Sequence, residues 1–207
     1  MRVEIHPTHP QSRLIARACD VLRDSGVVAY PTDSYYGIGC MLGAQNAIQR
    51  IREIRRMKKR QFLTLVCRDL SELSTFARVD NSSYRLIKSL TPGPYTFILQ
   101  ATRELPRRLQ DPKRKTIGLR IPDHAVVKAL LNELSSPMLS ATARGPNQES
   151  TDRDPIEIYE RIGRQIDILL DGGTSGSEPT TVIDLSLGEP ELVRRGAGAV
   201  KRLINLQ

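Results

Sequence analysis

The stretch Y-P-T-D-S-Y-Y-G-I-G-C, residues 30–40, follows a short apolar run at residues 27–30. The apolar run predicts a buried strand, and Pro31, which has no backbone N–H, marks its end. Hydroxyl and carboxylate side chains come next, followed by Gly37 and Gly39, which allow a sharp bend or a close approach of the backbone to a ligand. This order is typical of a small polar ligand at the edge of an α/β sheet. The same spacing also fits a Pro/Gly-rich loop that binds nothing.

Hydrophobic periodicity outside this stretch predicts alternating helices and strands. We expect helices at residues 12–24, 44–54, 82–90 and 155–162, a short helix capped by Asp69, and a helix from Asp123 to residue 134. We expect strands at residues 3–5, 27–30, 63–67, 96–100, 116–121, up to 139, 166–170, 181–185 and 191–194. The interleaved order favours an α/β architecture. We find no repeat and no linker, so the sequence predicts one domain, residues 1–207.

Composition narrows the class of protein. With 39% hydrophobic and 26% charged residues, the chain has the make-up of a soluble globular protein. No apolar run approaches the roughly 20 residues that span a bilayer, and the N-terminus lacks the form of a secretory signal. We therefore expect a cytoplasmic protein with no membrane partner. The three cysteines are widely spaced, which argues against a disulfide framework and against a zinc site.

The chain is basic, with 31 Lys and Arg against 23 Asp and Glu and a formal net charge of +8. A positive balance favours anionic partners such as nucleotides, pyrophosphate or RNA. Net charge alone does not separate such partners from an ordinary solvated surface.

Six motifs, in the same order along the chain, resemble those of the YrdC/YciO family of threonylcarbamoyl-AMP synthase-like proteins. The first is P-T-D-S-Y-Y-G-I-G-C, and the others are T-P-G-P-Y-T (91–96), T-I-G-L-R-I-P (116–122), P-M-L-S-A-T (137–142), P-T-T-V-I-D (179–184) and R-R-G-A-G (194–198). The stretch C-R-D-L-S-E-L-S-T (67–75) is similar to the YciO branch. Six ordered motifs are far more specific than one glycine-rich loop.

The resemblance implies both a fold and a reaction. The fold is YrdC/RibB-like: a single twisted mixed sheet flanked by helices, with a large concave basic pocket. In the reaction, the amine of L-threonine combines with bicarbonate, and the resulting carbamate attacks the α-phosphate of ATP as pyrophosphate leaves. ATP is then a substrate, with Mg2+ carried by its phosphates and no metal site in the protein. Such a site needs cations and hydroxyls that hold anionic reactants together.

The resemblance also assigns residues. Substrate contacts fall on Thr32, Tyr36, Arg120, Thr180 and Thr181, and nucleotide contacts fall on Thr116, Ser140 and Arg194. Arg120 suits a carboxylate because its planar guanidinium pairs two oxygens at once. Every assignment has a structural alternative: Tyr36 could simply pack, Ser140 or Thr181 could satisfy nearby backbone, Arg120 could pair with a structural carboxylate, and Arg194 could be solvated.

The sequence departs from the family pattern at one motif. Active members carry K-x-R, followed shortly by a basic residue and Pro-Leu. Here Arg55 replaces the lysine as the candidate catalytic cation, Met57 replaces the arginine, and Gln61 and Phe62 replace the basic residue and proline. The asparagine of the family's S-A-N motif is Thr142. Because one lost charge-assisted contact to a transition state costs on the order of 3 kcal/mol, the sequence predicts weak threonylcarbamoyl-AMP synthase activity, a step that precedes tRNA modification.

The alternative is a non-catalytic protein that binds nucleotides, double-stranded RNA or tRNA. Residues 50–60 form a basic run whose candidate RNA contacts are Lys58, Lys59 and Arg60, and residues 103–115 form a second one. Aromatic residues make up only 4% of the chain, with no Trp, so base-stacking platforms are scarce. Contact with duplex phosphates is therefore favoured over reading of single strands. Two solvated faces explain the same runs.

Overall fold

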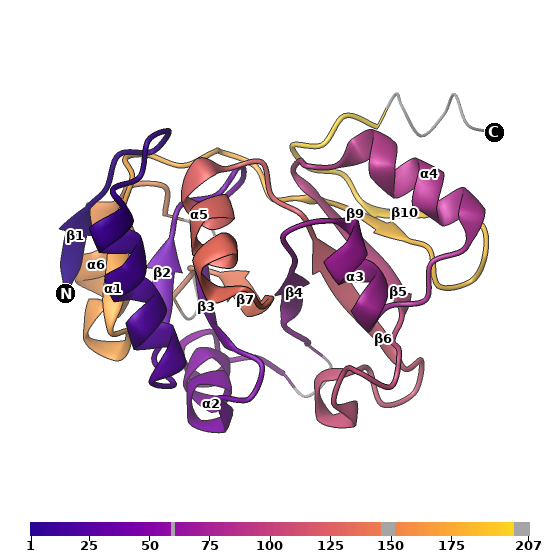
Figure 1. Ribbon diagram of the computed structural model, residues 1–207, viewed down its shortest axis with the longest axis horizontal. Coiled ribbons are helices and arrows are strands. Elements are labelled where there is room, and N and C mark those ends of the chain that lie inside the picture. Colours follow the sequence, from indigo (N-terminus) through magenta and orange to yellow (C-terminus); the bar gives the residue numbers. More distant parts are fainter. Residues whose placement is uncertain (59–60, 146–151, 201–207) are drawn as a thin grey trace.

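One mixed sheet organises the protein. The computed structural model describes all residues except 59–60, 146–151 and 201–207. Within the described part, ten strands form a single sheet in the order β1-β8-β2-β3-β7-β4-β6-β5-β9-β10 (Figure 1). Four neighbouring pairs are parallel (β1–β8, β8–β2, β4–β6 and β5–β9), and the other five are antiparallel. The mixed sheet flanked by helices agrees with the fold that the family resemblance implies.

The elements match most of the expected ranges. The strands are β1 (Arg2–Glu4), β2 (Val28–Tyr30), β3 (Gly37–Met41), β4 (Thr64–Val66), β5 (Tyr95–Gln100), β6 (Thr116–Arg120), β7 (Met138–Thr142), β8 (Ile168–Asp171), β9 (Thr181–Asp184) and β10 (Glu191–Arg194). The α-helices are α1 (Ser12–Arg23), α2 (Gln45–Ile54), α3 (Leu70–Phe76), α4 (Asn81–Leu90), α5 (Ala125–Leu134) and α6 (Pro155–Ile162). No helix in this described part is long and apolar enough to cross a membrane.

Helices cover both faces of the sheet, as the alternation of buried strand residues shows. In β2, Val28 and Tyr30 join one core cluster, while Ala29 joins the other. The first cluster is closed by α1 and α5, which lie side by side (Figure 1). The second is closed by apolar side chains of α2, α3, α4 and α6. A strand buried on both faces has no polar face, which is why residues 27–30 are continuously apolar.

Short side chains fix where several helices begin. Asp69 accepts a hydrogen bond from the backbone N–H of Glu72 at 2.9 Å, and Asp80 accepts one from Ser83 at 2.8 Å. Each carboxylate satisfies a backbone donor that the first turn of a helix leaves free. Pro155 occupies the first turn of α6, as its fixed φ and missing N–H allow. The starts of α3 and α6 could be read from the sequence because their causes are local, whereas α4 was expected from residue 82 and its Asp80 cap was not identified.

A sharp bend at Gly37 and Gly39, one of the two roles expected for these glycines, is not what the structure shows. Residues Gly37 to Met41 form β3, a central strand that pairs with both β2 and β7. Its glycines make room for a ring: a Cβ added at Gly37 or Gly39 would lie 3.0 Å from carbons of Tyr30. The glycines are needed for close packing between strands rather than for a bend.

The start of α5 also differs from the prediction. His124, rather than Asp123, is the N-cap, and its Nδ1 accepts a hydrogen bond from the backbone N–H of Val126 at 3.2 Å. The backbone N–H of Asp123 instead donates to the carboxylate of Asp33 at 2.8 Å. The chain therefore turns into α5 one residue later, and this corner is tied to the loop after β2.

Candidate functional site

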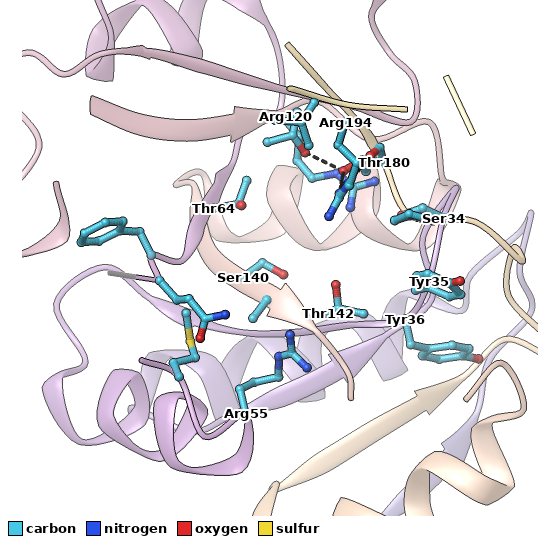
Figure 2. A pocket seen from close by; sticks show the side chains of 18 residues that line it. Ser34, Tyr35, Tyr36, Arg55, Thr64, Arg120, Ser140, Thr142, Thr180 and Arg194 are labelled. Carbon is cyan, nitrogen blue, oxygen red and sulfur yellow. Dashed lines mark hydrogen bonds between the residues drawn. The ribbon is translucent and has the colours of Figure 1, made fainter. Parts of the chain in front are cut away.

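A pocket of about 300 Å³ lies where the second half of the sheet meets the loop after β2 and the end of α2 (Figure 2). Its lining is rich in residues that carry a hydroxyl group: Ser34, Tyr35, Tyr36, Thr64, Thr96, Ser140, Thr142 and Thr180. Three guanidinium groups complete it, from Arg55, Arg120 and Arg194. Arg55 reaches in from one side and the other two from the opposite side, so the cations face one another across the hollow (Figure 2).

Arg55 is the C-cap residue of α2 and is half-buried. Its Nη1 donates to the backbone oxygen of Arg144 at 3.4 Å, and its buried Nε has no partner among the described residues. Burial and the nearby Arg144 guanidinium lower the pKa of Arg55 from its usual value. A buried donor without an acceptor carries a penalty that an anionic ligand would remove.

Arg120 ends β6 and forms an ion pair with Asp33, and both side chains are almost buried, at 12% and 9% exposed. Its Nε is a second buried donor that lacks a partner within the described residues. The structural alternative for Arg120, pairing with a carboxylate, is therefore present, yet the guanidinium still lines the pocket. Asp33 was not singled out as a site residue, because nothing local in the sequence pairs it with a residue 87 positions away.

Arg194 ends β10 and is held by Thr180. Its Nε and Nη2 donate to the backbone oxygen of Thr180 at 3.2 and 2.9 Å, and Nη2 also reaches the Thr180 hydroxyl at 3.1 Å. That hydroxyl lies 2.9 Å from the hydroxyl of Thr96. Burial lowers the pKa of Arg194 from its usual value. The network fixes one edge of the guanidinium in place.

Ser140 lies on β7, and its hydroxyl is already engaged. It accepts a hydrogen bond from the phenol of Tyr30 at 2.7 Å and donates to the backbone oxygen of Ile38 at 3.3 Å. Burial raises the pKa of Tyr30 to about 12, so the phenol stays neutral and remains a donor. The structural alternative for Ser140 is thus also present, although the residue does line the pocket. From the sequence we expected Tyr30 to lie in a buried strand. Its contact with Ser140 depends on the pairing of β3 with β2 and β7.

Three assigned residues do not line the pocket. Thr32, 5% exposed, hydrogen-bonds through its hydroxyl to the backbone oxygen of Tyr35 at 2.7 Å. Thr181 is fully buried, and its hydroxyl donates to the backbone oxygen of Gly198 at 2.7 Å. Thr116 begins β6, four residues before Arg120. The hydroxyls of Thr32 and Thr181 hold turns beside the pocket, as the structural alternative for Thr181 anticipated.

Tyr36 lines the pocket, but its hydroxyl is bound elsewhere. It donates to the backbone oxygen of Gly173 at 2.7 Å and accepts from the N–H of Gly172 at 3.1 Å. Burial raises its pKa above the usual 10. The phenol therefore anchors the loop after β8, and in Figure 2 it points away from the hollow.

The degraded motif also borders the hollow. Met57 lines the pocket beside Arg55, together with Gln61 and Phe62. Of the three candidate RNA contacts, Lys58 is exposed, whereas Lys59 and Arg60 lie outside the described residues. Thr64 and Thr96 were not assigned from the sequence, although the period-two rule gives the signal. In the register of β4 with β6, Thr64 pairs with Gly118, which shares a face with Arg120.

Comparisons with known proteins agree with this geometry. A family model described as "Telomere recombination", which covers the Sua5, YciO and YrdC proteins, matches residues 20–196. This chain belongs to that family. E. coli YciO is 51% identical over 197 residues, covering 95% of this chain and 96% of YciO. The crystal structure of E. coli YciO matches with a TM-score of 0.94, 50% identity and 98% coverage of both chains. The chain is therefore a YciO-type member.

More distant members of the family are enzymes by name. The threonylcarbamoyl-AMP synthase of Chromobacterium violaceum is 32% identical over 185 residues, covering 88% of this chain and 94% of the synthase. P. abyssi Sua5, solved in complex with L-threonine, matches with a TM-score of 0.88 at 23% identity. This match covers all of this chain and 60% of Sua5, and at that identity it shows a shared fold. The YciO-type chain is thus related to threonylcarbamoyl-AMP synthases.

Proposed function

We propose that the pocket binds ATP and L-threonine and that the protein forms threonylcarbamoyl-AMP slowly. The convergence of Arg55, Arg120 and Arg194 on one hydroxyl-lined hollow is the observation that supports this most. Fixed guanidinium groups attract and orient negatively charged reactants, and two of the three carry a buried donor with no partner among the described residues. The kinship with threonylcarbamoyl-AMP synthases suggests which anions these are.

In the proposed reaction the protein mainly holds charges in place. The amine of L-threonine and bicarbonate give a carbamate and water. A carbamate oxygen then bonds to the α-phosphorus of ATP, and the bond from that phosphorus to pyrophosphate breaks. Arg120 pairs with the threonine carboxylate, while Arg55 and Arg194 pair with phosphate oxygens. In this scheme Mg2+ is carried by the phosphates of ATP, which supply the oxygen ligands that it prefers.

The same pocket supports the expectation of low activity. Met57 lines it beside Arg55, and a thioether carries no charge that could stabilise a phosphoryl transition state. Thr142, also in the wall, offers a hydroxyl where the family pattern has an amide. Each missing contact lowers the rate by about a hundredfold if it acts mainly on the transition state.

Pyrophosphate release tests the proposal. The protein is incubated with ATP, L-threonine, bicarbonate and Mg2+, and each reactant is omitted in turn. We expect slow release that needs all the reactants and disappears in Arg120→Ala. The matched control is Arg85→Ala, which removes an exposed arginine on α4. Release that persists in Arg120→Ala, or no release from the unaltered protein, contradicts the proposal.

RNA binding without catalysis is the alternative to the proposed synthase activity. Two arginines of the basic run are engaged within the protein: Arg50 pairs with Asp167, and Arg52 donates to the backbone oxygen of Gln61 at 3.2 Å. No contact of the described residues favours RNA over a small anion. Salt-sensitive binding of duplex RNA that weakens in Lys58→Glu, together with no pyrophosphate release, would establish the binding protein instead.

A further inference from the structure

Asp33 is connected to the pocket lining through its ion pair with Arg120. One carboxylate oxygen of Asp33 pairs with Nη2 of Arg120, and the other accepts the backbone N–H of Asp123 at 2.8 Å. The second contact fixes the carboxylate to the corner between β6 and α5. Asp33 itself does not line the pocket, whereas Arg120 does. The carboxylate is thus a rigid support behind the guanidinium and does not contact a ligand in the hollow.

From this geometry we infer that Asp33 is a positioning residue: it holds the Arg120 guanidinium in the orientation that receives the carboxylate of an amino-acid substrate. The inference rests on the proposed function and deepens it. An arginine side chain has many rotamers, and freezing it at the moment of binding carries an entropic cost. Asp33 holds Arg120 before the ligand arrives. It takes Nη2 and leaves Nη1 for a ligand.

A second role for Asp33 predicts the opposite effect. If the carboxylate merely offsets the positive charge of the pocket, its removal adds one net positive charge beside the ligand. Affinity for every anion would then rise. If Asp33 positions Arg120, its removal frees the guanidinium, and affinity for a carboxylate falls. The sign of the change therefore separates the two roles.

The main experiment compares Asp33→Asn with a matched control, Asp184→Asn. Asparagine has the size of aspartate and keeps an acceptor for the Asp123 N–H, but it loses the charge that pairs with Arg120. Asp184 has the same kinds of partner: Arg114 at 2.7 Å and the backbone N–H of Ser186 at 2.9 Å. Its side chain is 5% exposed, and Arg114 does not line the pocket. Both variants remove an ion pair made by an almost buried aspartate, and only the first removes it behind the pocket.

Binding is measured by calorimetry with L-threonine and with L-threoninamide, which lacks the carboxylate. In Asp33→Asn we expect affinity for L-threonine to fall by about tenfold, the scale of a hydrogen bond to a charged group, and affinity for the amide to stay unchanged. Asp184→Asn changes neither. Higher affinity for L-threonine in Asp33→Asn, or the same loss in both variants, overturns the inference.

Asp33→Glu gives an independent variant should Asp33→Asn fold poorly. It keeps the charge and moves it by one methylene. Positioning predicts weaker binding of L-threonine, because the guanidinium is displaced. A purely electrostatic role predicts no change, and that result overturns the inference.

A readout without any ligand keeps the inference separate from the proposed function. In ¹⁵N-arginine spectra, a guanidinium held by an ion pair rotates slowly and shows separate Nη proton signals. We expect such signals for Arg120, assigned by their loss in Arg120→Lys, and we expect them to merge in Asp33→Asn but not in Asp184→Asn. Signals that stay separate in Asp33→Asn overturn the inference whether or not L-threonine binds. Held signals with no binding of L-threonine refute the proposed amino-acid substrate alone.

Discussion

At the scale of single residues, the sequence motifs predicted which residues line the pocket better than they predicted where the hydroxyl groups of those residues point. Arg120, Ser140 and Arg194 all line the pocket to which the family resemblance assigned them. The hydroxyl of Tyr36, by contrast, binds the loop after β8, and that of Thr181 binds Gly198. A hydroxyl group forms a hydrogen bond with a nearby backbone group, and the sequence does not show which backbone groups will be near it in the folded chain.

Met57 offers a prediction at this scale. Met57→Arg restores a guanidinium beside Arg55, where the phosphates of ATP are proposed to lie, so we expect pyrophosphate release to rise by about tenfold or more. Release is followed with saturating ATP and L-threonine. Met57→Leu, which alters shape without charge, is the control and should leave the rate unchanged. A rate in Met57→Arg equal to that of the unaltered protein would mean that the missing cation is not the cause of weak activity.

At the scale of elements, the glycines of β3 stand out in the sequence, but their structural role differs from the expected one. Its glycines were expected to allow a bend or a close approach to a ligand, and they lie in a strand between β2 and β7. The ring of Tyr30 fills the space above them, and its phenol reaches Ser140. One strand of small residues thus lets a buried tyrosine set the orientation of a hydroxyl in the pocket wall.

The packing of β3 gives a second prediction. A Cβ at Gly39 would lie 3.0 Å from a ring carbon of Tyr30 and 3.1 Å from the backbone oxygen of Leu139. Neither neighbour can move freely, because the ring is buried and the oxygen belongs to β7. Gly39→Ala should therefore lower the free energy of unfolding by about 1–3 kcal/mol, measured by urea titration. The control is Gly43→Ala, where an added Cβ meets nothing within 4 Å. Equal stability of the two variants would contradict this account of β3.

At the scale of the whole molecule, the pocket is formed by elements that are distant in the sequence. The strand order of the sheet differs from the order of the strands along the chain, and this difference brings them together. The end of α2 brings Arg55, β6 brings Arg120 and β10 brings Arg194, and these elements meet only in the folded chain. The ion pair between Asp33 and Arg120 joins the loop after β2 to β6 in the same way. Binding a ligand between these segments should also stabilise the fold by mass action.

Stability in acid is a third prediction, and it belongs to the molecule as a whole. The pKa values of Asp69, Asp80 and Asp111 lie below the usual 3.8, chiefly because backbone N–H groups donate to their carboxylates. A pKa lowered by folding stabilises the native state above the unfolded value, and this contribution is lost as the pH falls through the folded value. The free energy of unfolding should therefore drop below about pH 4.

The triple variant Asp69→Asn, Asp80→Asn, Asp111→Asn tests the cause. Asparagine still accepts the hydrogen bonds but does not titrate, so the difference in stability between neutral pH and about pH 3 should shrink. Urea unfolding at both pH values measures it. A difference as large as in the unaltered protein would place the acid sensitivity elsewhere.

The features that follow from the sequence alone are those with local causes: the alternation of helices and strands, the starts of α3 and α6, and the family motifs that mark the pocket wall. The folded structure was needed to show that the glycine stretch is a central strand, that Asp33 stands behind Arg120 and that Thr116 and Thr181 lie outside the hollow. The physical reason is the distance along the chain over which each kind of interaction acts. Caps and periodicity act within a few residues, whereas these contacts are set by strand register between segments up to 110 positions apart, as for Tyr30 and Ser140.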